Sequence, residues 1–148
     1  MNIIRAGLLL VVVGAVVVGF LFRDRLTGKA DDMRVGDCIE LPTAQEFGEI
    51  QHRPCTEPHE AEVFVVKDFA NGPESLPSMT ALDAWVDEHC LGQAFTDYVG
   101  RTYDEAQEIG VGYFSPTASG WRDGDKEMVC YLAPVAGGTI SFSYKKPG

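Results

Sequence analysis

Residues 61–69 read AEVFVVKDF and form the strongest strand pattern in the chain. The run is rich in β-branched and aromatic residues, which fit the pleated surface of a sheet. Asn71-Gly72-Pro73 follows it and is a typical turn sequence. The pattern therefore predicts a β-strand that ends at this turn.

Weaker strand patterns lie on both sides of this run. We expect further strands within residues 35–41 (VGDCIEL), 48–55, 107–114 (QEIGVGYF), 127–134 and 139–144 (TISFSY), with loops at 42–47 and 115–125. One long helix is predicted from Ser78 to Val99, because apolar residues there, including Trp85, recur at three- and four-residue steps. Ser78 suits the N-cap and Gly100 the position after the last turn. Strands, one helix and then more strands predict an α+β domain, with a small, mainly antiparallel sheet and the helix packed on one face.

The first quarter of the chain differs from the rest. Residues 6–22 read AGLLLVVVGAVVVGFLF, 17 residues without a charge. A helix of this length spans roughly 26 Å, close to the thickness of a hydrocarbon core. A cleaved signal peptide is the alternative, but the run exceeds a usual signal core and Gly28-Lys29-Ala30 is a weak cleavage match. We expect a transmembrane anchor at residues 1–25, a linker at 26–34 and one domain at 35–148.

The location of that domain is predicted from its cysteines. The positive charges around the apolar run favour a cytoplasmic C-terminal part, but only weakly. The four cysteines all follow the run, lack CxxC spacing and are typical of disulfides in an exported domain; they are Cys38, Cys55, Cys90 and Cys130. We expect a single-pass membrane protein with its C-terminal domain outside the cytoplasm. A net charge of −10 argues against nucleic acid as a partner.

Residues 55–63 read CTEPHEAEV and gather the residue types of a reactive site. The spacing of His52, Cys55 and His59 matches no zinc template, and a disulfide would remove Cys55 as a ligand. His89 and Cys90 are neighbours on a predicted helix, so their side chains diverge and do not form a base–nucleophile pair.

The acidic residues and the proline of this stretch also have structural interpretations. Glu60 and Glu62 are two residues apart on one strand face, which is more typical of a solvated face than of paired catalytic acids. Pro58 is expected to set a turn, and His59 to hydrogen-bond nearby backbone at the strand entry. Pro58, His59 and Glu62 remain the candidates in this stretch for a functional or strand-entry role.

Other residues are expected to serve turns and the core. Asp37 and Asp125 each follow a glycine, where a carboxylate commonly accepts backbone N–H bonds. Gly124 belongs to the same turn as Asp125. Trp85 is expected in the core, and Trp121 between the sheet and a loop.

In combination, several motifs resemble the septum formation family of exported or membrane-anchored domains, found mostly in actinobacterial envelopes. They are VGDC at 35–38, CTEPHEAEV at 55–63, Cys90 within a helix, PTASGW at 116–121 and WRDGDKEMVC at 121–130. The resemblance covers nearly all of residues 35–133. It implies the disulfides Cys38–Cys55 and Cys90–Cys130, whereas four cysteines alone allow three pairings. It also implies a link to division or envelope assembly, without an established reaction.

We therefore expect a non-enzymatic domain that binds envelope or membrane proteins, with no catalytic residue, metal, or small-molecule cofactor. One alternative is an accessory single-span subunit of a larger membrane complex, secretory or respiratory, with Gly7, Gly14, Ala15 and Gly19 offering small helix faces. The alternative from another class is an envelope hydrolase that uses His59 with an acidic residue such as Glu62.

Overall fold

The computed structural model describes residues 33–42 and 50–148. The expected anchor at 1–25 and most of the expected linker lie outside these residues. Among the residues that are described, no helix is long and apolar enough to cross a membrane. Met33, at the end of the expected linker, is 4% exposed and packs in the core.

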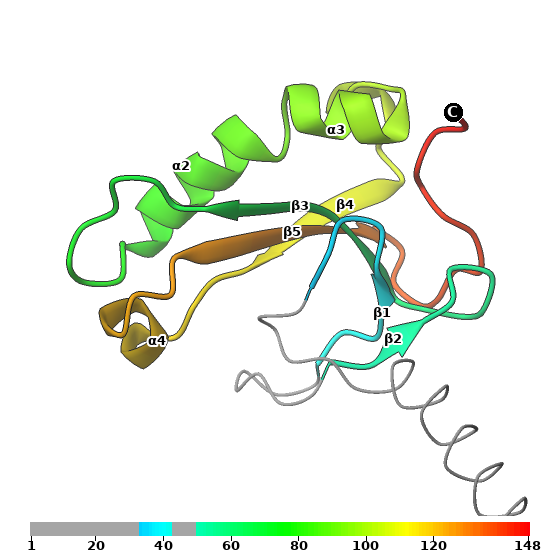
Figure 1. Ribbon diagram of the computed structural model, residues 1–148. Coiled ribbons are helices and arrows are strands. Elements are labelled where there is room, and N and C mark those ends of the chain that lie inside the picture. The colour runs from blue at the N-terminus through cyan, green and yellow to red at the C-terminus, as the bar shows by residue number, and fades with distance from the viewer. Residues whose placement is uncertain (1–32, 43–49) are drawn as a thin grey trace, which may run out of the picture.

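Five antiparallel strands form a single sheet in the order β2-β1-β3-β5-β4 (Figure 1). The strands are β1 (Cys38–Ile39), β2 (His52–Arg53), β3 (Ala61–Asp68), β4 (Ile109–Phe114) and β5 (Glu127–Pro134). The predicted antiparallel sheet is confirmed. The long strand expected at 61–69 is β3, and it lies in the middle because β1 and β5 pair with its two edges.

Both faces of β3 are covered, which explains its nearly continuous apolar run. Phe64 packs with the helices in one core cluster, together with Cys130 and Leu132 of β5. Val63 points to the opposite face and packs with Ile39, Ile50 and Val129 in a second cluster. A register shift between Val63 and Val65 marks a bulge in the pairing of β3 with β5.

The prediction of one long helix is wrong. The structure has two helices on one face of the sheet, α2 (Met79–His89) and α3 (Gln93–Val99) (Figure 1). Ser78 caps α2 as expected, and its side chain accepts a bond from the N–H of Ala81. Cys90 is the C-cap of α2 and is disulfide-bonded to Cys130 of β5, and Gly92, which precedes α3, leaves helical geometry at ψ −125°. Gly100 ends α3 with a φ of 84°.

Two other expectations also need correction. Residues 115–125 are not only loop, because Thr117 caps the short helix α4 (Ala118–Arg122). Residues 139–144 are not a strand. Gly137 and Gly138 precede them at positive φ, and only Ile140 forms a bridge, with His59. A 3-10 turn, η2 (Tyr103–Glu105), joins α3 to β4.

Candidate functional site: a buried carboxylate and the C-terminal segment

The most buried acidic side chain lies at the start of β3. Glu62 is only 1% exposed. Its Oε1 accepts hydrogen bonds of 2.6 Å from the hydroxyls of Tyr98 and Ser143, and its Oε2 accepts one of 2.6 Å from the N–H of Tyr144. We call these four residues the Glu62 site, and residues 139–148 the C-terminal segment. The expectation that Glu62 lies on a solvated strand face is wrong, because Tyr98 of α3 and the C-terminal segment cover it.

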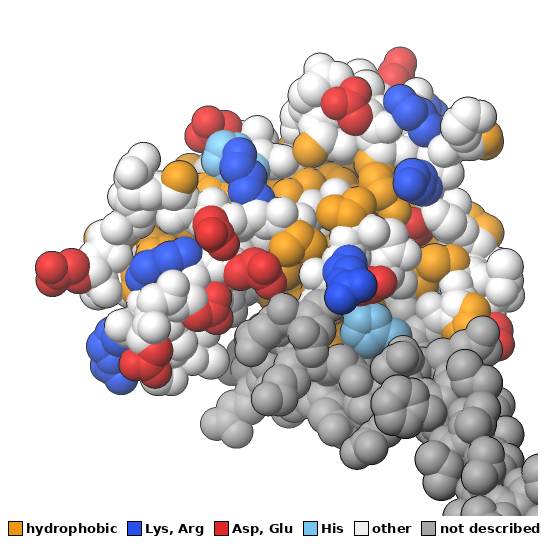
Figure 2. All heavy atoms as spheres, viewed as in Figure 1, with side chains coloured by type: hydrophobic (Ala, Val, Ile, Leu, Met, Phe, Trp, Pro, Cys, Tyr) orange, Lys and Arg blue, Asp and Glu red, His pale blue; other side chains and the backbone are white. Residues whose placement is uncertain are grey.

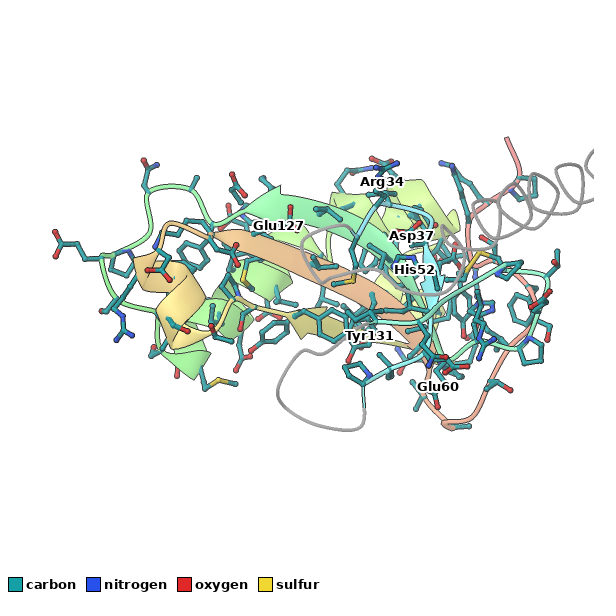
Figure 3. The ribbon with its side chains drawn as sticks, turned by 60° about the horizontal axis from the view of Figure 1, so that its bottom comes forward. Arg34, Asp37, His52, Glu60, Glu127 and Tyr131 are labelled. Atoms are coloured by element: carbon teal, nitrogen blue, oxygen red, sulfur yellow. A yellow bond between two sulfur atoms is a disulfide. The ribbon has the colours of Figure 1, made fainter. Side chains whose placement is uncertain are left out.

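Glu60 has different surroundings although it is two residues away. It is partly buried, and its Oε2 accepts a 2.8 Å bond from the N–H of Leu41 (Figure 3). The two carboxylates therefore do not act as a pair, and each one organises a separate piece of backbone.

The partners of Glu62 are all neutral donors. None of the ion pairs between described residues includes Glu62. These three short hydrogen bonds replace the water that the carboxylate loses on burial, so that it can be buried without a cation beside it. Burial raises the pKa of Tyr98 above its usual 10.0, and the hydrogen bond and negative charge of Glu62 raise it further. Tyr98 therefore stays protonated and donates.

His59 holds the C-terminal segment through its backbone. Its N–H and C=O each form a 2.9 Å bond with Ile140, and its side chain is fully buried. Nδ1 lies 2.8 Å from the carbonyl of Glu57, and because a carbonyl oxygen only accepts, Nδ1 is the donor in this bond. Nε2 has no hydrogen-bond partner within the described part of the chain. Pro58 is exposed and follows a turn closed by the N–H of Glu57 and the carbonyl of Pro54.

Both disulfides implied by the resemblance are present. Cys38 is bonded to Cys55, and Cys90 to Cys130. In the described ranges, one group of three possible metal ligands comes together, consisting of Cys38, Cys55 and Glu62. The two sulfurs are bonded to each other, so this group offers no thiolate. His52 lies apart from it and pairs with Asp37 at 3.5 Å (Figure 3).

The expected turn residues close backbone turns. Asp37 accepts a 2.8 Å bond from the N–H of Arg34, and Asp125 accepts a 3.0 Å bond from the N–H of Glu127. Gly124 precedes Asp125 with a φ of 101°. These positions shape loops at the two ends of the sheet.

Both tryptophans are buried. Trp85 is 6% exposed and stacks on Phe69. Trp121 is fully buried, and its Nε1 donates a 2.9 Å bond to the carbonyl of Pro73. The residues that sequence reasoning missed are Tyr98, Ser143 and Tyr144. Their signal was weak, because Tyr98 continues the buried face of a helix and Ser143 and Tyr144 resemble a strand.

Two hollows of about 690 and 680 Å³ flank the C-terminal segment. Ser143, Lys145, Lys146 and Pro147 line both. The larger hollow has apolar walls that include Val99, Ile109, Val135 and Phe142. On the face shown in Figure 2, acidic and basic side chains are interspersed with apolar patches instead of forming one charged field.

Comparison with known proteins gives a match to one family model. No curated protein and no solved structure matches this chain. The family model described as Septum formation matches residues 35–145, which is most of the chain and includes both disulfides and the Glu62 site. The chain belongs to the septum formation family.

Proposed function

We propose that this chain is a membrane-anchored, extracytoplasmic domain that binds proteins during cell-envelope or septum assembly and catalyses no reaction. Family membership supports the process, and the two disulfides support a location outside the cytoplasm. The apolar run at residues 6–22 supports the anchor. The observation that carries the binding role is the larger hollow beside the C-terminal segment.

Two exposed apolar side chains flank that hollow. Val135 is 65% exposed and Phe142 is 56% exposed, and both line it. Single exposed apolar residues are ordinary on protein surfaces, whereas two around one apolar groove are typical of an interaction site. Lys145 and Lys146 border the same groove and add positive charge in an acidic chain. The groove therefore fits a partner with an apolar anchor and acidic neighbours.

The hydrolase alternative has less support from the geometry. Both His59 and Glu62 are inaccessible, at 0% and 1% exposure. The oxygens of Glu62 already accept three bonds, and Nδ1 of His59 is used by a backbone carbonyl. A polymer substrate would reach neither side chain without displacement of the C-terminal segment. Their contacts instead support a structural role in holding that segment.

Crosslinking of the full chain in its native membrane, followed by mass spectrometry, tests the proposal. We expect the double variant Val135→Ser with Phe142→Ser to lose the partner peptides that the wild type captures. Met79→Ser is the matched control, since Met79 is 67% exposed but does not line the groove. Circular dichroism checks that each variant is folded. Identical captured partners in all three proteins would contradict the assignment of this groove.

A further inference from the structure

The C-terminal segment binds the domain in the way that a separate peptide would. Five hydrogen bonds join it to described residues of the body: two between Ile140 and His59, two to Glu62, and one from the N–H of Lys146 to the carbonyl of Tyr98. Tyr144 also packs against the core cluster beneath the helices. Every one of these contacts is made to residues 59–100 or to the core, and none depends on the residues that lead into the segment.

The connection to the segment is a pair of glycines. Gly137 and Gly138 have φ values of 73° and 84°, and a Cβ built on either would meet nothing within 4 Å. Val135, two residues before the glycines, is fixed because its N–H bonds to the carbonyl of Glu108, and the N–H of Gly137 bonds to the carbonyl of Pro134. The glycines are therefore the place where the chain can change direction, at the cost of the bond between Gly137 and Pro134.

Packing does not lock the segment in place. The two hollows lie on either side of residues 143–147, so much of the segment stands between open spaces instead of within a close-packed layer. Segments with few apolar contacts and solvent-exposed backbone bonds open at a fraction of the global unfolding free energy. The rest of the described domain, in contrast, is crosslinked by both disulfides.

We propose that the C-terminal segment exchanges between two copies of this chain, so that the segment of one copy fills the Glu62 site of the other. Departure of the segment removes two of the three donors of Glu62 and exposes to water the part of the core that Tyr144 covers, which is costly. The segment of a second copy restores the hydroxyl of Ser143, the N–H of Tyr144 and the ring of Tyr144. Closed monomer and exchanged oligomer then differ mainly in the path of Gly137 and Gly138 and in the entropy of association.

This inference goes beyond the proposed function, because it names a copy of this chain as a partner and assigns the Glu62 site to it. It does not depend on the groove variants described above. Reciprocal exchange gives a closed dimer, whereas exchange passed from copy to copy gives an open chain.

Isotope-coded photocrosslinking of the full chain in detergent tests the exchange. Lys146 is replaced by a diazirine-bearing lysine analogue, because its side chain lies against Gly100. Normal and heavy-nitrogen preparations are mixed, incubated and irradiated. We expect crosslinks from position 146 to the Gly100 peptide that join normal with heavy chains. In a variant lacking Gly137 and Gly138, whose short connection cannot fold back, the mixed fraction should approach about half, the limit for random exchange.

Two controls make the result decisive. The same analogue at exposed Lys67 measures chance proximity within a micelle, and insertion of two glycines after Gly138 should reduce mixed crosslinks relative to the wild type. Fluorescence of the buried tryptophans confirms that each variant is folded. The proposal is overturned if the position-146 crosslinks of the wild type join only chains of the same isotope, whatever the deletion variant shows. It is also overturned if the deletion variant is folded with its segment uncrosslinked.

Discussion

Replacing Glu62 tests whether its hydrogen bonds outweigh the cost of burying its charge. Two substitutions separate the effects. Glu62→Gln keeps the shape and one acceptor oxygen but removes the charge. Glu62→Leu keeps approximate volume and removes every acceptor. If the three donors matter more than desolvation, the order of stability is wild type, then Gln, then Leu.

The magnitudes follow from the identity of the donors. In the Gln variant, the amide oxygen can face the N–H of Tyr144 while its NH₂ donates to the hydroxyl oxygens of Tyr98 and Ser143. The charge assistance is lost, and so is the carboxylate acceptor of the two hydroxyl hydrogens, which together cost about 1–2 kcal/mol. In the Leu variant the N–H of Tyr144 has no replacement acceptor, and three buried donors are orphaned. The expected cost is about 3–5 kcal/mol, partly offset because no carboxylate is desolvated.

Urea unfolding measures these free energies, with fluorescence of the buried Trp85 and Trp121 as the signal. Hydrogen exchange of residues 139–148 gives a local measurement, and the Leu variant should lose protection there first. A Leu variant as stable as the wild type, or more stable, would refute the reasoning. Such a result would mean that burying the charge costs more than its three bonds contribute.

Three further predictions concern other parts of the domain. Because burial and Glu62 raise the pKa of Tyr98, the stability from this group is complete below its usual 10.0 and falls as the pH rises further. Tyr98→Phe should therefore lose less stability than the wild type between pH 10 and 12 in urea titrations. Removing both cysteines of the Cys90–Cys130 pair, which are 40 residues apart, should lower the free energy of unfolding by about 4 kcal/mol. Removing the Cys38–Cys55 pair, which are 17 residues apart, should lower it by about 3 kcal/mol, because the closed loop is shorter. Equal urea midpoints for the two variants would contradict the argument from loop entropy. Gly72→Ala should destabilise the domain by about 1–3 kcal/mol, because the added Cβ would lie 2.7 Å from the buried ring of Trp121. Gly110→Ala is the control, because its Cβ would meet no atom closer than 3.5 Å, and it should unfold at the same temperature as the wild type.

The sequence predicted the sheet well where local pattern and tertiary position agree. The run at 61–69 is β-branched and is also the central strand, so both influences favour the same structure. The helix break at Cys90–Gly92 was not predictable from periodicity, because apolar residues continue at helical spacing through it. Cys90, which ends α2, is held to β5 by its disulfide to Cys130, 40 residues later, and Gly92 between the two helices leaves helical geometry.

The site was less predictable because it is made by distant residues. Glu62 has the sequence pattern of an exposed acid, and its burial depends on Tyr98 and on Ser143, which lies 81 residues away. The TISFSY segment alternates as a strand does, but from Ser143 onward its polar groups bond to the Glu62 carboxylate instead of to a neighbouring strand. Long-range hydrogen bonds of this kind leave no local trace in a sequence.

The two disulfides have a mechanical consequence when the domain is pulled at its two ends. Under tension between its ends, the chain can lengthen only through residues outside the Cys38–Cys55 and Cys90–Cys130 loops, because covalent bonds close those loops. The C-terminal segment lies outside both and is joined to the body by hydrogen bonds and one aromatic side chain. A pulling force at the C-terminus would therefore detach this segment before it unfolds the sheet.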